Sequence, residues 1–143
     1  MKKVHYYLLL ICSLLVISCS STSYLKKGAN GENIDTRLVG EWAGSEKDQQ
    51  EKGLSKEWVM ERNDDGTFVL HFTVIENGKS RTHDEEGNWW ILDDQYYEFH
   101  EDSGKTDVYT YKVLNKDQIK FSSKELTMGM TGDVYEFVDT RKK

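Results

Sequence analysis

A strict alternation of large apolar residues with polar ones is the feature that most constrains how this chain folds. From Thr36 onward, apolar side chains recur at every second position, most clearly in Phe68, Leu70, Phe72 and Val74. A period of two places these side chains on one face of a strand, whereas a helix repeats about every 3.6 residues. The pattern therefore predicts an all-β fold of antiparallel strands with one face on the core.

Turn sequences lie where the alternation breaks. Asp65-Gly66 and Asn77-Gly78 are strong hairpin signals because their residues tolerate the positive φ of a tight turn. The charged segment 46–56 lacks an apolar stripe and is predicted to be a loop, or one helical turn, at a barrel mouth. The predicted strands are 38–43, 55–62, 67–76, 79–86, 88–92, 96–101, 106–113, 118–123 and 132–140. We predict a small antiparallel up-and-down barrel of about eight strands, because closure removes the exposed edges.

The first 18 residues have the pattern of a secretory signal peptide. Lys2 and Lys3 precede an apolar run over residues 8–17. A helix needs about 20 apolar residues to cross a bilayer, so this run is too short to span one. Its length and basic flank are typical of a signal-peptide core. We predict a signal peptide over residues 1–18 that is removed from the mature protein.

The end of this run carries a motif for lipid attachment. Val16-Ile17-Ser18-Cys19 resembles the lipobox of bacterial lipoproteins. The resemblance implies that Cys19 becomes the first mature residue and carries acyl chains such as palmitate, which anchor the protein to a membrane of the cell envelope. Ser20 stands where Asp would favour inner-membrane retention, which implies the outer membrane, facing the periplasm, in a Gram-negative cell. Residues 19–35 are then the lipidated N-terminus and a flexible tether, and 36–143 the folded domain.

Several classes of function are disfavoured by composition. The formal net charge is −6, which disfavours nucleic acid as a partner. Cys12 leaves with the signal peptide and Cys19 is committed to lipid, so no thiol remains for catalysis, metal or a disulfide. No Gly-x-Ser-x-Gly motif occurs, and His71, His83 and His100 lack metal-ligand spacing. We therefore expect no enzyme, no metal and no cofactor, while a protein partner is left unspecified.

Short motifs in the domain carry a family resemblance. Gly40-Glu41-Trp42, a second Gly-x-Trp at 87–89, and Tyr135-x-Phe137-x-x-x-Arg141 occur in this order. With the hairpin strands between them, residues 36–141 resemble the lipocalin-like domains of bacterial envelope lipoproteins, within the calycin group. The resemblance implies a barrel in which Trp42 plugs one end and Arg141 packs across it.

Aromatic residues are the candidates for ligand binding. The alternation places Tyr97 inward, together with Tyr109, Tyr111 and Tyr135, and it places His71 and His100 outward. Buried tyrosine hydroxyls need hydrogen-bond partners, which favours a partly polar interior. The candidate ligand-binding residues are Trp58, Phe72, Trp90, Tyr97, Tyr109, Tyr111 and Tyr135.

Two functions remain open at this point. The first is a barrel that binds a small apolar or amphipathic ligand inside. The second is a non-catalytic protein-interaction or inhibitor module of the cell envelope, with a filled barrel. A cavity of about 300 Å³ or more would favour the first, and a solid interior with an exposed apolar patch near Met128 and Met130 would favour the second.

Overall fold

The computed structural model describes residues 23–125 and 135–143, and within these ranges every regular element is a β-strand. No described segment forms a helix long and apolar enough to cross a membrane. The strands are β1 (Leu25–Lys27), β2 (Asn33–Asp35), β3 (Gly40–Lys47), β4 (Leu54–Arg62), β5 (Thr67–Glu76), β6 (Lys79–Leu92), β7 (Gln95–His100), β8 (Lys105–Asn115), β9 (Gln118–Glu125) and β10 (Glu136–Arg141). The all-β prediction is confirmed.

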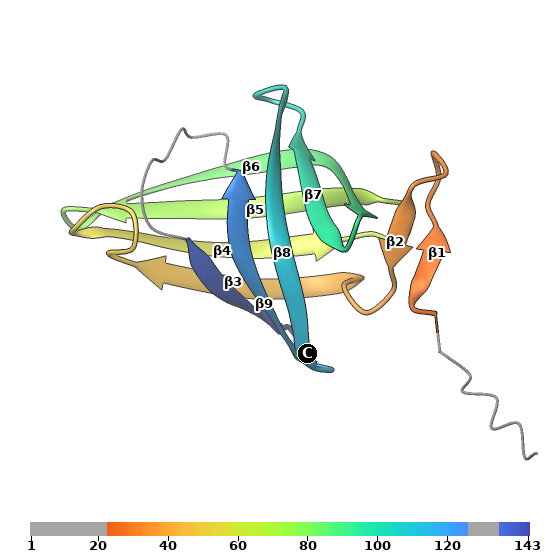
Figure 1. Ribbon diagram of the computed structural model, residues 1–143. Helices are drawn as coiled ribbons and strands as arrows, with labels where there is room; N and C mark the ends of the chain where they lie inside the picture. The colour runs from red at the N-terminus through yellow and green to blue at the C-terminus, as the bar shows by residue number, and fades with distance from the viewer. Residues whose placement is uncertain (1–22, 126–134) are drawn as a thin grey trace, which may run out of the picture.

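Strands β3 to β10 form a closed eight-stranded barrel (Figure 1). Each strand pairs antiparallel with the next one along the chain, and β10 returns to pair with β3. At this junction Thr140 lies opposite Ala43 and Arg141 lies opposite Trp42. Closure leaves the barrel without an unpaired edge. The predicted up-and-down barrel is therefore confirmed.

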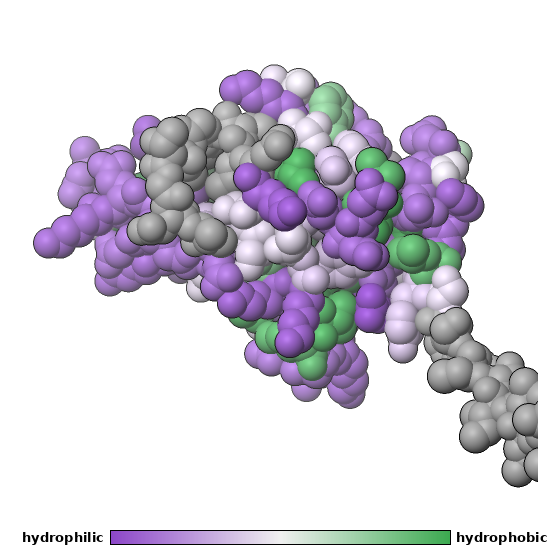
Figure 2. Space-filling view, in the orientation of Figure 1, coloured by the Kyte–Doolittle hydropathy of each residue, from purple (hydrophilic) through white to green (hydrophobic). Residues whose placement is uncertain are grey.

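The outside of the barrel is largely hydrophilic. Hydrophilic residues cover much of the face seen in Figure 2, and the hydrophobic residues on it lie in small separate groups. Each strand of an antiparallel barrel presents alternate residues inward and outward, so this surface is the polar half of the alternation in the sequence. The core and the site of interest therefore lie inside the barrel.

One predicted strand break is absent. Strand β6 runs without interruption from Lys79 to Leu92, where the sequence analysis placed two strands separated at Gly87. Gly87 pairs with Phe68 on one side and with His100 on the other. A Cβ at this position would overlap the carbonyl oxygen of Phe99. The glycine therefore marks a close approach of two backbones within the barrel, and the strand continues through it.

The inward face of β7 is the opposite of the predicted one. Tyr96, Glu98 and His100 are buried, whereas Tyr97 lies on the outer face. The pairing with β6 explains the difference, because Tyr96 lies opposite Ile91, whose side chain is in the core. The prediction that Tyr97 faces inward and His100 outward is wrong. Both faces of this short strand carry aromatic rings, so hydrophobicity alone did not distinguish them.

A hairpin of β1 and β2 covers one end of the barrel, on the right in Figure 1. Ile34 is fully buried, and Asn33 pairs with Ile91 of β6. Asp35 is also buried and accepts a hydrogen bond of 2.9 Å from the hydroxyl of Tyr111. The predicted tether over 19–35 therefore does not hold for Leu25–Asp35, because Ile34 supplies apolar surface to the core. The signal peptide and residues 19–22, which include Cys19, lie outside the described residues.

The end of the barrel beneath this hairpin is filled. Its fully buried side chains, here called the sealed end, are Ile34, Leu38, Trp42 and Trp89. The indole nitrogen of Trp42 donates to the carbonyl of Leu38 at 2.8 Å. The guanidinium of Arg141 lies 4.0 Å from the centre of the Trp42 ring, the contact implied by the family resemblance. Trp42 and Arg141 together close this end.

Candidate functional site

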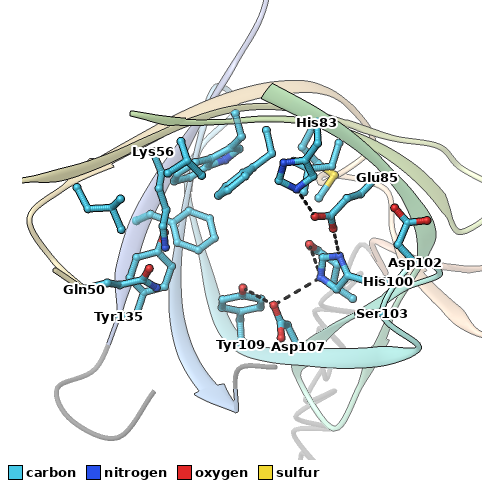
Figure 3. Close-up of a pocket in the computed structure, with 18 of the residues that line it drawn as sticks. Gln50, Lys56, His83, Glu85, His100, Asp102, Ser103, Asp107, Tyr109 and Tyr135 are labelled. Atoms are coloured by element: carbon cyan, nitrogen blue, oxygen red, sulfur yellow. Dashed lines mark hydrogen bonds and ion pairs between the residues drawn. The ribbon is translucent and has the colours of Figure 1, made fainter. Parts of the chain in front are cut away.

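The other end of the barrel holds a cavity of about 690 Å³. It lies between inward side chains of β4, β5, β6, β7, β8 and β10, and the β3–β4 and β7–β8 loops reach its mouth (Figure 3). In Figure 1 the long β3–β4 and β5–β6 hairpins extend at this end, opposite the β1–β2 hairpin. The barrel is thus solid at one end and hollow at the other.

One side of the cavity is apolar. Its residues, here called the apolar wall, are Trp58, Met60, Leu70, Phe72, Val74 and Phe137. They occupy alternate inward positions of β4 and β5, with Phe137 added from β10. The Trp58 ring stacks on Phe72 at a centroid distance of 6.4 Å and meets the edge of Phe137 at 5.0 Å. These rings offer a continuous surface to the apolar part of a ligand.

The opposite side carries charged groups. Its residues, here called the polar wall, are Glu85, Glu98, His100, Asp107 and Tyr109. His100 lies at the centre, with Nδ1 at 2.6 Å from Glu85 Oε2. His100 Nε2 lies 3.4 Å from Glu98 Oε1 and 3.5 Å from Asp107 Oδ2, and His83 Nε2 lies 2.7 Å from Glu85 Oε1. Figure 3 shows Glu85, His100 and Asp107 pointing into the cavity from the neighbouring strands β6, β7 and β8.

The carboxylates around His100 change its protonation. Burial lowers the pKa of His100, but the carboxylates of Asp107, Glu85 and Glu98 outweigh that effect and raise the pKa to about 10. In turn, the bond from His100 lowers the pKa of Glu85. Burial raises the pKa of Glu98 despite its cationic neighbours. His100 is therefore an imidazolium at neutral pH, facing carboxylates on several sides.

A buried ion-pair network lies at the deep end of the cavity. Arg62 donates from Nη2 to Asp139 at 2.9 Å and from Nε to the Tyr96 hydroxyl at 3.0 Å. Tyr96 in turn donates to Glu98 Oε2 at 2.7 Å, which links this network to the polar wall. Trp58 Nε1 also donates to Asp139, at 2.8 Å. Arg62 Nη1 is buried and has no hydrogen-bond acceptor among the described residues, so one donor at the cavity floor is unsatisfied.

A second ion pair lies nearer the mouth. Lys56 Nζ is 3.7 Å from Glu46 Oε1, and both side chains are buried. Burial lowers the pKa of Lys56, although the charge of Glu46 opposes that change. From the sequence, Glu46 was predicted to lie in a charged loop or helical turn, and Lys56 where that segment overlaps the predicted strand 55–62. The structure instead extends β3 to Lys47 and starts β4 at Leu54, which turns Glu46 and Lys56 inward.

The predicted ligand-binding residues separate into two sets. Four of the seven line the cavity, namely Trp58, Phe72, Tyr109 and Tyr135. The other three do not: Tyr111 reaches Asp35 beside the sealed end, while Trp90 and Tyr97 stack on each other on the outer face at 5.3 Å. Trp90 follows the buried Trp89, so only one ring of this pair can face inward. The prediction that Trp90 and Tyr97 lie in the interior is therefore wrong, whereas Tyr111 packs against the core without lining the cavity.

Of the polar wall, only Tyr109 was predicted from the sequence. His100 was predicted to face outward, and no inward role was predicted for Glu85, Glu98 or Asp107. The available signal was the spacing Tyr96-x-Glu98-x-His100, which places both polar residues on the same face as a large ring. Met128 and Met130, predicted to mark an interaction patch, lie outside the described residues. Within residues 23–125 and 135–143, no group of three or more acidic, histidine or cysteine side chains has the arrangement of a metal site.

Comparison with known proteins identifies the family of this domain. No curated protein matches the chain. A family model described as a lipocalin-like domain matches residues 38–121, which is more than half of the sequence. The matched stretch begins just before β3 and ends within β9, so it covers the strands that carry the polar wall and most of the apolar wall. The chain belongs to the lipocalin-like domain family.

Proposed function

We propose that this protein binds a small amphipathic ligand inside its barrel, without catalysis, while lipid on Cys19 holds it to a membrane of the cell envelope. The observation that carries the ligand part of the proposal is the cavity of about 690 Å³ between one apolar and one polar wall. Pockets for small molecules range from about 300 to 1,000 Å³ and combine apolar surface with a few polar groups. The cavity has this size and this division of chemistry.

The buried charges support a role in binding. Taking ionised groups out of water costs several kcal/mol per ion, and apolar packing in their place is often as stable. A barrel that served only as a stable scaffold would gain nothing from Glu98, His100 and Arg62 in its interior. Their position around a cavity favours recognition of a ligand. The alternative of an interaction module depended on a filled barrel, so the cavity favours ligand binding.

The geometry of the polar wall supports a non-catalytic role. Both oxygens of Glu85 are engaged, one by His83 and one by His100. General acid–base catalysis needs a group that can take up or release a proton near neutral pH. The carboxylates hold His100 in its charged form, since its pKa is about 10. The wall is therefore suited to hold a polar group in place.

Native mass spectrometry of protein purified from its own host tests ligand binding. The wild type is expected to carry a small molecule that is released on unfolding. Val74→Trp, which places a large ring in the cavity, should abolish that extra mass. Val69→Trp makes the same change on the outer face of the same strand and should retain it. A ligand retained equally by both variants, or no bound molecule in the wild type, would contradict the proposal.

Membrane anchoring is proposed from the lipobox-like motif alone and needs its own experiment. The wild type should be found in the membrane fraction with an acylated first residue at Cys19, and Cys19→Ser should remain unprocessed and unacylated. The N-terminal peptide can be identified by mass spectrometry in both cases. A Cys19→Ser protein that is still processed and held in the membrane would overturn this part of the proposal.

A further inference from the structure

The cavity has more acid than base on its polar side. Two of its cations are already neutralised, because Lys56 is paired with Glu46 and Arg62 with Asp139. His100 is then the one cation of the polar wall, where it faces the carboxylates of Glu85, Glu98 and Asp107. Even with Glu98 protonated, Glu85 and Asp107 face one buried imidazolium. The other basic residues that line the cavity, His83 and Arg81, are exposed, and Arg81 lies 3.6 Å from Glu76. The polar wall therefore presents net negative charge to the cavity.

These charges are shielded from water. The side-chain exposures are 21% for Glu85, 13% for Asp107 and 9% for Glu98. Charges interact more strongly at such sites than at an exposed surface, because less water screens them. A cationic group entering the cavity would be stabilised here. A carboxylate entering it would lose its own hydration and meet like charge on the polar wall.

A second observation points to a ligand at the same place. Two buried nitrogens, Arg62 Nη1 and His100 Nε2, have no hydrogen-bond acceptor among the described residues. Arg62 is 2% exposed and lines the deep end of the cavity. Both nitrogens are donors, since the guanidinium is always charged and the imidazolium carries a proton on each nitrogen. An oxygen atom of a ligand would satisfy them.

We propose that the ligand is an amphipathic amine whose head group also carries a hydroxyl or carbonyl oxygen. Its ammonium lies against the carboxylates of the polar wall, its oxygen accepts from Arg62 or His100, and its apolar chain lies along the rings of the apolar wall. The inference rests on the proposed function, because it names the ligand class for the same cavity. The proposed ligand class differs from a fatty acid, whose head group is a carboxylate.

A series of probes with the same eight-carbon chain tests the inference on the folded wild-type protein by isothermal titration calorimetry. The probes are 2-amino-1-octanol, octylamine, 1-octanol and octanoate. We expect octylamine to bind about tenfold or more tightly than octanoate, because like charges brought together cost several kcal/mol. 2-Amino-1-octanol should bind more tightly than octylamine, since it adds the oxygen.

Variants then locate the preference on the polar wall. Glu85→Gln removes one carboxylate and should reduce the octylamine-to-octanoate affinity ratio about tenfold or more. Glu86→Gln makes the same change on the next residue, which is exposed on the outer face, and should leave the ratio unchanged. Asp107→Asn gives an independent second variant from strand β8 if Glu85→Gln folds poorly.

The outcomes separate the two proposals. Octanoate binding as tightly as octylamine would overturn the amine inference and leave the proposed function standing. Equal affinities of 2-amino-1-octanol and octylamine would overturn the part that assigns an oxygen to Arg62 and His100. Failure of all four probes to bind would count against the proposed function itself.

Discussion

The sealed end and the cavity end of this barrel use the same strands in different ways. At the sealed end, Trp42 and Trp89 are fully buried beneath Ile34, and the indole of Trp42 has its acceptor in the carbonyl of Leu38. At the cavity end, inward positions carry ionised groups, and some donors lack partners among the described residues. One end is filled by apolar side chains, and the other has space and buried ionised groups.

The difference shows where stability and recognition arise in a small barrel. Apolar burial contributes about 25 cal/mol per Å², so the sealed end supplies much of the folding free energy. The cavity end gives up part of that gain to hold Glu98, His100 and Arg62 out of water. Substitutions at the sealed end should therefore act on folding, and those at the cavity end should act mainly on binding.

The largest expected effect is from Trp42→Ala at the sealed end. Removing a fully buried indole should lower the free energy of unfolding by about 3–5 kcal/mol. Phe72→Ala on the apolar wall should cost only about 1–2 kcal/mol, because that ring is half-buried beside existing space, and it should weaken ligand binding. Urea unfolding followed by circular dichroism measures both. Equal losses of unfolding free energy in the two variants would contradict the claim that the sealed end contributes more to stability than the cavity end.

Gly44→Ala should have the next largest effect, at the cavity end. A Cβ on Gly44 would overlap the ring of Trp58 and force it away from its bond to Asp139. Overpacking of this kind costs about 1–3 kcal/mol in the free energy of unfolding. The double variant Gly44→Ala with Trp58→Leu should recover part of that loss, because the smaller side chain relieves the overlap. Additive losses in the double variant would show that the two sites do not contact each other.

The pH dependence of stability should depend on His100. Its pKa is about 10 in the folded protein and about 6.5 when unfolded, so the folded state holds the extra proton between these values. The stabilisation is complete below about pH 6.5 and is lost as the pH rises towards 10. His100→Gln should be less stable than the wild type by about 1–2 kcal/mol at pH 6, with screening by water included. The difference in free energy of unfolding between the two proteins, measured by urea unfolding, should disappear near pH 10. A difference that stays constant with pH would contradict the raised pKa of His100.

The smallest effect is expected on the outer face. Trp90→Ala removes a half-exposed ring that stacks on Tyr97 outside the barrel. The free energy of unfolding should fall by about 1 kcal/mol or less, and the affinity for 1-octanol should stay the same. Calorimetry on this variant and on Phe72→Ala compares the two faces. Loss of affinity in Trp90→Ala would place the ligand outside the barrel.

The architecture could be predicted from the sequence because one physical signal dominates it. The alternation in segments such as Phe68–Val74 sets the inward face, and turn residues set the hairpins. Ile34 was missed because a single apolar residue in a polar segment carries no period. It becomes part of the core only when the β1–β2 hairpin reaches the barrel end.

The site could be predicted only in its aromatic residues. Trp58 and Phe72 follow from the alternation, since a large ring at an inward position reaches the interior. Glu98 and His100 could not be found in this way, because a polar residue is assigned outward by any rule based on hydrophobicity. Their inward position is fixed by the pairing of β7 with β6, and that register depends on contacts between strands.

The four tryptophans allow the most direct test, because they sample the different regions of the molecule. Trp42 and Trp89 lie at the sealed end, Trp58 on the apolar wall, and Trp90 on the outer face. The measurement is a titration with 1-octanol followed by the four indole N–H signals in ¹H–¹⁵N NMR spectra. A ligand inside the cavity should shift the signal of Trp58 and leave the other three nearly in place. A titration that shifts the signal of Trp90 or Trp42 and leaves that of Trp58 unchanged would contradict binding in the cavity.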